Sequence, residues 1–202
     1  MTVAIIDYKM GNLRNVQKSL EWVGCKTVIT NDPALIRTAA GVILPGVGAF
    51  ADAIINLTKM NLIDVIQEVI DEGKPLLGIC LGLQLLFEYS EENGYYEGLK
   101  IFKGGVKRIP AGLKVPHMGW NQLNIKKETP ILDGVADKTA CYFVHSYHVV
   151  PEEDIVAATV DYGQEIVAVV AKDNVFGIQF HPEKSSQAGL GILRNYRKLV
   201  EN

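Results

Sequence analysis

The sequence of 202 residues has little of what marks several specialised classes of protein. Its three cysteines, Cys25, Cys80 and Cys141, are odd in number and have neither paired nor metal-type spacing. A disulfide scaffold is therefore not expected, and a reduced, cytoplasmic protein is the default. No apolar run approaches the ~20 residues that cross a membrane. The first residues lack the basic segment of a signal peptide, so we expect none.

Charge of either sign is also not in excess. A formal net charge of −3 provides no basic field for nucleic acid or for an anionic membrane, and we expect neither as a partner. Internal repeats and low-complexity segments are missing as well. What remains, 48% hydrophobic and 21% charged residues, is ordinary for a globular protein. The length suits a single domain, residues 1–202, with a substantial core.

The first half of the chain alternates between strand and helix patterns. We expect strands at 3–6, 26–30, 41–44 and in the run that leads to Cys80, with helical regions at 13–23, 33–39 and 49–71, the last of these with a break near 60–61. This alternation predicts a mostly parallel sheet with helices on both faces. The carboxyl ends of its strands would bring together the loop after Asp7, the loop Pro45–Gly48 and the segment around Cys80.

The second half is richer in short β patterns. These lie at 99–102, 122–125, 140–144, 155–160, 165–170 and 175–180, before a closing helix that Ser185 or Ser186 would cap and that runs to Val200. The runs at 155–160 and 165–170 read as a hairpin. The predicted fold is therefore α/β, with a smaller antiparallel or mixed sheet as an extension.

One motif in the first half carries chemistry. Gly78-Ile79-Cys80-Leu81-Gly82 follows a predicted strand and precedes a predicted helix, which is the cysteine version of a nucleophile elbow. The glycines would relieve crowding at the sharp turn, and the following helix would favour a thiolate and an oxyanion. Alone, the motif leaves two interpretations open, a nucleophile or a small buried thiol.

A thiol nucleophile needs a base and a group that orients the base. Of four histidines, His181 is the best placed, at a strand end before Pro182. In an extended segment Glu183 would lie on the same face as His181, about 7 Å along the backbone. His145 and His148 would point to opposite faces of a strand, and no acidic or cysteine cluster accompanies them, so no metal site is predicted.

Cys80 together with His181-Pro182-Glu183 resembles the triad of the class I glutamine amidotransferases. Further blocks narrow the resemblance to the branch formed by the glutaminase subunits of imidazole glycerol phosphate synthases. These blocks are Asp7-Tyr8 with Gly11-Asn12, Pro45–Gly48, Pro116–Asn121 and Tyr142–His148. Together they span almost the whole chain.

The resemblance implies a reaction and its residues. Cys80 would attack the carboxamide of glutamine, His181 would carry the proton, and Glu183 would hold His181, through a glutamyl thioester and without a cofactor. The backbone N–H groups of Leu81 and Val47 would form the oxyanion hole. Glutamine-binding positions would be Gly46, Gly48, Gln84, Ser146 and Tyr147. Because glycines flank Val47, its peptide could reorient, and we expect the oxyanion hole to form only when a partner binds its own substrate.

The partner implied is a (β/α)₈ cyclase subunit in a heterodimer, which receives the ammonia for histidine biosynthesis. The resemblance places Asn12, Asn15, Met118 and Trp120 at that interface, with Trp120 either an anchor or a core residue. Lys9 departs from the glycine common at this position of the family. Since lysine resists positive φ, we expect the first loop to be shaped differently.

Three other interpretations remain open. The chain could be the glutaminase of anthranilate or aminodeoxychorismate synthesis, which the block Pro116–Asn121 disfavours. It could be a catalytically silent interaction subunit, which the intact Cys80, His181 and Glu183 disfavour. It could also be a stand-alone cysteine hydrolase, although without a synthase domain of its own any ammonia released would need an outside acceptor.

Overall fold

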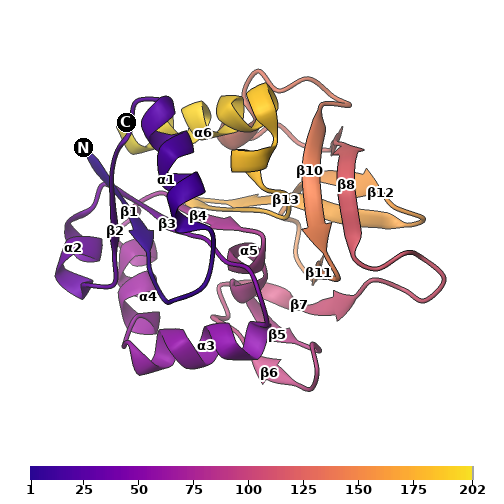
Figure 1. Cartoon of the computed structure of the whole chain (residues 1–202), viewed down its shortest axis with the longest axis horizontal. Helices are drawn as coiled ribbons and strands as arrows, with labels where there is room; N and C mark the ends of the chain where they lie inside the picture. The colour runs from indigo at the N-terminus through magenta and orange to yellow at the C-terminus, as the bar shows by residue number, and fades with distance from the viewer. Residues whose placement is uncertain (202) are drawn as a thin grey trace.

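A central sheet of eight strands organises the computed structural model, which describes residues 1–201 (Figure 1). The strand order is β2-β1-β3-β4-β14-β13-β12-β9, and the strands from β2 to β14 are parallel to one another, while β13, β12 and β9 pair antiparallel. The strands are β1 (Thr2–Ile6), β2 (Lys26–Thr30), β3 (Gly41–Leu44), β4 (Leu76–Ile79), β9 (Asn124–Ile125), β12 (Val156–Asp161), β13 (Glu165–Lys172) and β14 (Val175–Ile178).

Two smaller sheets extend the second half of the chain. One pairs β8 (His117–Gln122) with β10 (Ala140–His145), and the other has the order β11-β7-β5-β6. The strands of the latter are β5 (Phe87–Ser90), β6 (Tyr96–Glu97), β7 (Phe102–Arg108) and β11 (Tyr147–Pro151). The predicted fold class, a mostly parallel sheet with a mixed extension, is confirmed.

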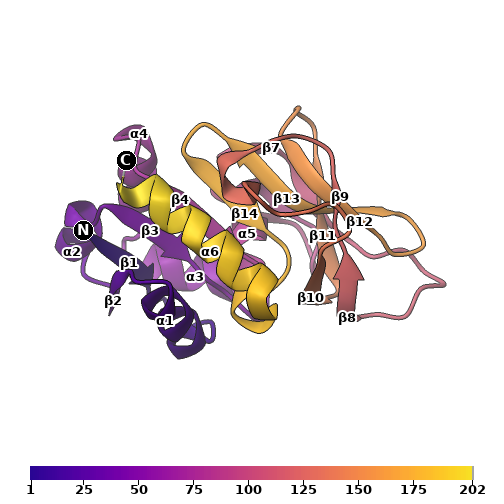
Figure 2. The ribbon, with the colours of Figure 1, turned by 90° about the horizontal axis from the view of Figure 1, so that it is seen from above.

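Helices cover both faces of the central sheet (Figure 2). They are α1 (Leu13–Trp22), α2 (Pro33–Thr38), α3 (Phe50–Lys59), α4 (Ile63–Asp71), α5 (Leu81–Leu85) and α6 (Ser186–Glu201). Buried residues of α1 and α6 share one hydrophobic core, and those of α2, α3 and α4 share the other. Successive residues of β1 alternate between these cores: Val3 and Ile5 face α1, whereas Ala4 and Ile6 face the opposite layer.

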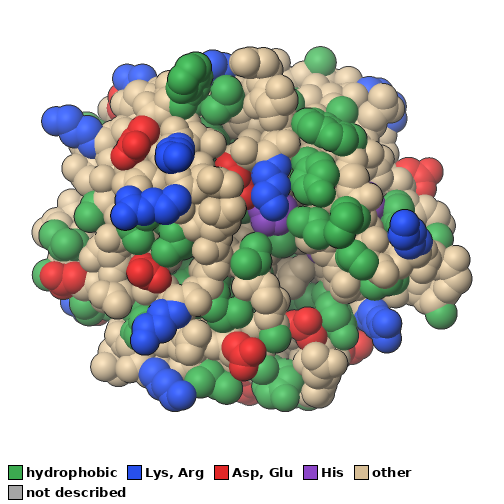
Figure 3. All heavy atoms as spheres, viewed as in Figure 1, with side chains coloured by type: hydrophobic (Ala, Val, Ile, Leu, Met, Phe, Trp, Pro, Cys, Tyr) green, Lys and Arg blue, Asp and Glu red, His purple; other side chains and the backbone are tan. Residues whose placement is uncertain are grey.

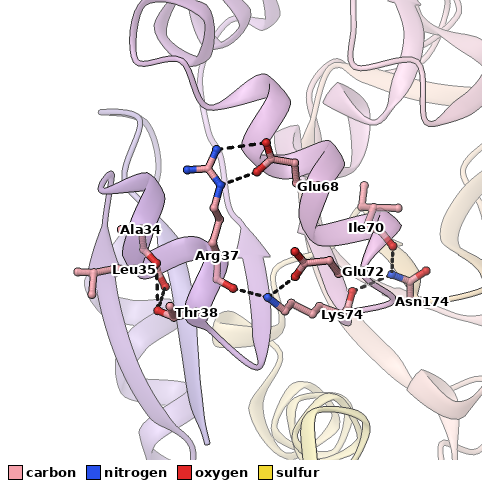
Figure 4. Close-up of polar contacts among 9 residues, drawn as sticks. All are labelled: Ala34, Leu35, Arg37, Thr38, Glu68, Ile70, Glu72, Lys74 and Asn174. Carbon is pink, nitrogen blue, oxygen red and sulfur yellow. Dashed lines mark hydrogen bonds and ion pairs between the residues drawn. The ribbon is translucent and has the colours of Figure 1, made fainter.

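Polar contacts join the amino-terminal ends of β4 and β14, away from Cys80, to the neighbouring helices (Figure 4). The Arg37 guanidinium on α2 donates to the Glu68 carboxylate on α4 at 2.5 Å and 3.2 Å. Asn174, just before β14, donates to the backbone carbonyls of Ile70 at 2.9 Å and Lys74 at 2.8 Å, and the Lys74 ammonium reaches the carbonyl of Arg37. These bonds tie the start of β4 and β14 to the helical layer, leaving the other ends of the strands open for a site.

Several predicted elements need correction. The long helical region breaks near Met60 as expected, where Asn61 takes a φ of 54°, and the hairpin of β12 and β13 is also as expected. The β pattern at 99–102 is wrong, because strand β7 begins only at Phe102. The block 116–121 is largely a strand, β8, and β5 follows the elbow helix directly after one residue; neither strand was predicted.

Candidate active site

The elbow at Cys80 is built by close approach of backbone segments. Strand β4 ends at Ile79, and Cys80 has φ 53° and ψ −107°, a conformation that costs energy for a residue with a Cβ. A Cβ on Gly82 would lie 1.8 Å from the carbonyl oxygen of Leu44, and one on Gly78 would lie 2.8 Å from the backbone of Gly82. Both glycines are therefore required by packing. The predicted helix after the elbow is present as α5, which is only five residues long.

His181 and Glu183 meet beside the elbow. Strand β14 ends at Ile178, and the His181 backbone N–H donates to Tyr142 at 2.9 Å. His181 Nδ1 lies 2.9 Å from Glu183 Oε1, and both side chains are almost fully buried. The expected reason for this proximity was wrong: residues 182–184 form a 3₁₀ turn, not an extended segment, and the turn brings Glu183 back to His181.

Electrostatics favour a charged imidazole at His181. Burial lowers its pKa, but the Cys80 thiol and the Glu183 carboxylate outweigh burial and raise the pKa to about 9. Within residues 1–201, His181 Nε2 is buried without a hydrogen-bond partner. The Cys80 thiol lies instead 4.0 Å from the carbonyl of Val144, so thiol and imidazole are neighbours that are not yet hydrogen-bonded.

The loop Pro45–Gly48 lies against the elbow, and one of its carbonyl groups occupies the expected oxyanion hole. The Leu81 N–H donates to the Gly46 carbonyl at 3.3 Å. Because the C=O and N–H of one trans peptide point in opposite directions, the Val47 N–H of that peptide is directed away from Leu81. The structure thus brings the two predicted donors, Leu81 and Val47, close in the fold but does not aim them at one point.

Tyr8, which the sequence marked only as part of a family block, lies beneath this loop. Its buried hydroxyl donates to the Pro45 carbonyl at 2.6 Å, and burial followed by the nearby Cys80 raises the pKa of Tyr8 far above its ordinary value. A Cβ on Gly46 would lie 2.2 Å from the same hydroxyl. The tyrosine therefore holds the loop at its start, whereas Val47 and Gly48 are exposed.

A cavity of about 360 Å³ opens beside Cys80 and is lined by most of the predicted glutamine-binding residues. Its lining includes Val47, Gly48, Gln84, Ser146 and Tyr147, while Gly46 lies just behind it, buried under the loop. A larger groove of about 810 Å³ borders α6 at Asn195 and contains none of the predicted site residues.

Gln84 is buried rather than a polar residue on an exposed helix face. Its side-chain Nε2 donates to the Tyr147 carbonyl at 3.0 Å and to Gln179 Oε1 at 3.2 Å. Gln179, which the sequence reasoning missed, is fully buried and its Nε2 lies 3.6 Å from Cys80 Sγ. Its position two residues before His181, on the segment that leaves β14, is a signal that could have drawn attention to it.

A pair of buried histidines flanks the cavity. His145 Nδ1 is 2.8 Å from the Tyr147 carbonyl, so this nitrogen carries the proton, and His145 Nε2 accepts from His117 Nδ1 at 2.9 Å. Burial lowers the pKa of His117 to about 4 and that of His145 to about 3, so both rings are neutral. No group of three or more His, Cys, Asp or Glu side chains in residues 1–201 could hold a metal ion.

The predicted interface residues are exposed on one side of the molecule. Met118 and Trp120 are 61% and 57% exposed on β8, which excludes core packing for Trp120, and Asn12 and Asn15 are exposed at the start of α1. Helix α1 and strand β8 both face the viewer in Figure 1 and lie along the lower edge of Figure 2. Figure 3 shows hydrophobic side chains gathered over β8 and β10 and a hollow at the centre of this face.

The first loop does not have the different shape that we expected from Lys9. Lys9 adopts φ 65° despite its side chain, and its N–H donates to Asp7 Oδ1 at 3.0 Å, so the loop takes the left-handed turn that glycine would take.

Cys141 is buried in a core, while Cys25 is half-buried at its margin. No helix among residues 1–201 is long and apolar enough to cross a membrane.

Comparisons with known proteins agree with this geometry. A family model described as "Glutamine amidotransferase class-I" matches residues 4–198. The "Imidazole glycerol phosphate synthase subunit HisH" of Moorella thermoacetica is 54% identical over 99% of this chain and 96% of its own length, and that of Aquifex aeolicus is 52% identical over 100% and 98%.

Solved structures share the fold at lower identity. A glutamine amidotransferase superposes with a TM-score of 0.78 at 17% identity, covering 99% of both chains. Another, from Thermotoga maritima, gives 0.70 at 16% identity and covers 100% of this chain and 99% of its own. The chain belongs to the class I glutamine amidotransferases and, within them, to the family of the imidazole glycerol phosphate synthase subunit HisH. The predicted family is confirmed, and the chain is a glutamine amidotransferase.

Proposed function

We propose that this chain is the glutaminase subunit of an imidazole glycerol phosphate synthase. It hydrolyses glutamine to glutamate and ammonia, and a (β/α)₈ cyclase subunit uses the ammonia to make imidazole glycerol phosphate and aminoimidazole carboxamide ribotide. The observation that carries the proposal is the buried set of Cys80, His181 and Glu183 beside a cavity, in a chain about half identical to relatives that bear this subunit's name. We further propose that residues 1–202 act as one cytoplasmic domain.

In the first half of the reaction a thioester forms. The Cys80 thiol gives its proton to His181 Nε2, a buried ring nitrogen without a hydrogen-bond partner among residues 1–201. The sulfur then attacks the carboxamide carbon, His181 returns the proton to the amide nitrogen, and the C–N bond breaks as ammonia leaves. Glu183 accepts from His181 Nδ1 at 2.9 Å and keeps the ring in the productive orientation.

In the second half water hydrolyses the thioester. His181 takes a proton from the water, the hydroxide oxygen bonds to the acyl carbon, and the C–S bond breaks to release glutamate. The proton returns to the sulfur. The raised pKa of His181, about 9, means that this imidazole takes up a proton readily and holds it for return to the sulfur.

The cavity orients the substrate by polar atoms that remain free. Both protons of Gln84 Nε2 are committed to Tyr147 and Gln179, so its Oε1 is the atom offered to an N–H group of glutamine. Ser146 and the backbone at Gly48 supply further polar lining. This arrangement suits a small amino acid rather than a bulky substrate.

The oxyanion hole requires a rotation of the peptide between Gly46 and Val47. In the resting arrangement the Gly46 carbonyl takes the Leu81 N–H. Rotation would free Leu81 and aim the Val47 N–H at the same point, so one movement supplies both donors. A single donor is worth about 2.7–4 kcal/mol of barrier in other hydrolases. We propose that the partner, when its own substrate is bound, stabilises the rotated peptide.

The partner binds the face that carries Met118 and Trp120 on β8 and Asn12 and Asn15 on α1. Exposed aromatic and methionine side chains are enriched at the centres of protein interfaces, and two alternate residues of one strand present them together here. The same face is hollowed at its centre. We propose that ammonia leaves through this face to the partner.

The test mixes the full chain with a candidate cyclase subunit and its phosphorylated ribosyl-carboxamide substrate and follows glutamate release. We expect release that the cyclase substrate stimulates and that Cys80→Ala abolishes, while Cys25→Ala, at a half-buried thiol remote from the cavity, leaves it intact. Stimulation by an anthranilate-type partner instead would assign another pathway. Binding without any glutamate release would indicate a silent interaction subunit. Equal glutamate release by the free chain and by the loaded complex would refute the proposed rotation of the Gly46–Val47 peptide but not the glutaminase assignment.

A further inference from the structure

Gln179 is a fully buried polar residue between β14 and His181, in contact with the sulfur of Cys80. Its backbone N–H continues the sheet pairing by donating to Ala168 at 2.9 Å. Its side-chain Nε2 lies 3.6 Å from Cys80 Sγ, and its Oε1 lies 3.2 Å from Gln84 Nε2. A buried amide is costly unless both of its ends are hydrogen-bonded, and here the two ends are used by the nucleophile and by a cavity residue.

The direction of this amide is fixed by a chain of bonds that begins at a backbone carbonyl. Tyr147 O can only accept, so the atom of Gln84 that faces it at 3.0 Å must be the donating nitrogen. The same nitrogen faces Gln179, which must therefore present its oxygen there. The NH₂ end of Gln179 is left for Cys80 Sγ, and the alternative orientation would place two NH₂ groups against each other.

The carbonyl of Tyr147 is itself held in place by the neutral histidine pair. His145 Nδ1 donates to it at 2.8 Å, and His117 donates to His145 in turn. Asn121, on β8, completes the chain at 3.3 Å from His117 Nε2. The donors of this chain therefore point from β8 to the Tyr147 carbonyl, and Gln84 donates to the same carbonyl from the cavity side. The accepting carbonyl fixes the amide orientation of Gln84 and, through it, that of Gln179.

We propose that Gln179 is a catalytic residue whose side-chain N–H stabilises the thiolate of Cys80. A donor to an anionic sulfur is a charge-assisted bond, stronger than the same bond to a neutral thiol or thioester. The bond therefore favours the thiolate before attack, weakens when the C–S bond forms, and strengthens again when the thiolate leaves during thioester hydrolysis. His181 remains the proton carrier, and Gln179 exchanges no proton with the substrate.

This inference rests on the proposed function of Cys80 as nucleophile and adds a second stabilising group beside His181. Helix α5 has only five residues, so a helix dipole supplies little of the stabilisation expected from the sequence. Among residues 1–201, the Gln179 amide is an N–H donor within hydrogen-bond distance of the sulfur, at 3.6 Å. A merely structural role would be packing and satisfaction of Gln84, which leaves the chemistry of the sulfur unchanged.

The test measures the rate at which iodoacetamide alkylates Cys80 across pH, in the full chain, with the modified peptide followed by mass spectrometry. Gln179→Met removes the donor at similar length, and Gln179→Glu removes it while keeping an oxygen toward Gln84 Nε2. We expect the pH midpoint of Cys80 alkylation to rise by about one unit in Gln179→Met. In Gln179→Glu we expect at least the same rise, because a carboxylate replaces the donor.

A matched control separates this effect from general loosening. Asn195→Ala removes another buried amide, which donates to the carbonyls of Ile131 at 3.2 Å and Asp133 at 2.7 Å on the far side of the core. It should leave the Cys80 midpoint unchanged. If Gln179→Met leaves the midpoint unchanged, or if Asn195→Ala shifts it equally, the proposal is overturned; should Gln179→Met not fold, Gln179→Leu, which also removes the donor without adding a charge, takes its place. Alkylation needs no turnover, so this failure is distinct from failure of the glutaminase assignment, which Cys80→Ala tests.

Discussion

The two sides of the active site differ in how firmly they are built. On the elbow side, Cys80, Gln179 and His181 are buried, and Gly82 approaches the Leu44 backbone so closely that no side chain could be added. On the loop side, Val47 and Gly48 are exposed, and the loop is held near its start by one hydroxyl, that of Tyr8. The nucleophile is preorganised, whereas the oxyanion donors are not.

This difference follows from what each side can do without breaking packing. A rotation at Cys80 would disrupt the elbow, the sheet pairing of β4 and the contacts of Gln179 at once. A rotation of the peptide after Gly46 costs only the bond between its carbonyl and Leu81 N–H. Control of catalysis is therefore expected at the loop, because a partner can shift an equilibrium only by binding one of its two states better.

The largest effect should come from His181→Asn, which attacks the rigid side. Loss of the proton carrier should reduce glutamate release by about 10⁶-fold, as for the histidine of other triads that act as a unit. The loss should be the same with and without the cyclase substrate, because this side does not depend on the partner. His148→Asn, at a histidine on β11 that contacts Gln164, is the matched control. A loss seen only in the loaded complex would contradict the distinction between the two sides.

Val47→Pro attacks the loop side alone. Proline removes the N–H that we assign to the oxyanion hole but leaves the resting bond from Leu81 to Gly46 in place. We expect about 10²–10³-fold lower glutamate release in the loaded complex. The slow release by the free chain should hardly change, since the donor is turned away there. Val47→Ala keeps the N–H and serves as the control; an equal loss in that variant would assign the effect to the side chain.

The sequence predicted the rigid side better than the loop side. The spacing of Gly78, Cys80 and Gly82 marks a tight turn, because its glycines are required by backbone contact, and such requirements are local. The pairing of His181 with Glu183 was predicted, but from an extended segment, whereas a 3₁₀ turn brings the two side chains together. The orientation of the Gly46 peptide was beyond the sequence, because both orientations suit a glycine and the choice rests on Leu81 and Tyr8.

Tertiary contacts also decided the parts of the fold that were missed. Strand β5 follows the elbow helix with no turn signal and is defined by pairing with β6 and β7. Gln179 was read as one residue of a strand, because its partners Cys80 and Gln84 lie almost a hundred residues earlier in the chain. Local patterns carry no information about such partners.

Tyr8→Phe should weaken the hold on the loop by a smaller amount. The variant loses the hydrogen bond from the hydroxyl to the Pro45 carbonyl, and the space it leaves above Gly46 eases movement of the loop. One such bond has a net worth of about 0.5–1.5 kcal/mol, so glutamate release by the free chain should rise about two- to tenfold. Release by the loaded complex should change less. Lower release by the free chain would mean that Tyr8 supports the active arrangement instead.

The free energy of unfolding should depend on pH through the buried histidines His117 and His145. Burial holds the pKa values of His117 and His145 at about 4 and 3 in the folded chain, below the ordinary 6.5. Between these folded-state pKa values and 6.5, the unfolded chain binds more protons than the folded chain. The stability that the neutral pair contributes is therefore complete above pH 6.5 and falls as the pH falls. Each histidine contributes a slope of up to about 1.4 kcal/mol per pH unit.

His117→Phe isolates this contribution. The phenyl ring keeps the stacking on Phe143 and Tyr162 but cannot take a proton. Urea unfolding between pH 7 and pH 5 should therefore show a shallower loss of stability in this variant than in the native sequence. His181 acts in the opposite direction: with its pKa raised to about 9, its contribution to stability is complete below pH 6.5 and declines between pH 6.5 and 9. This contribution is the same in both proteins, so it does not affect the difference between their slopes. Tyr8 stays neutral throughout the range, so Tyr8→Phe should shift the free energy of unfolding equally at every pH. A slope unchanged by His117→Phe would mean that the acid sensitivity lies elsewhere and not beside the nucleophile.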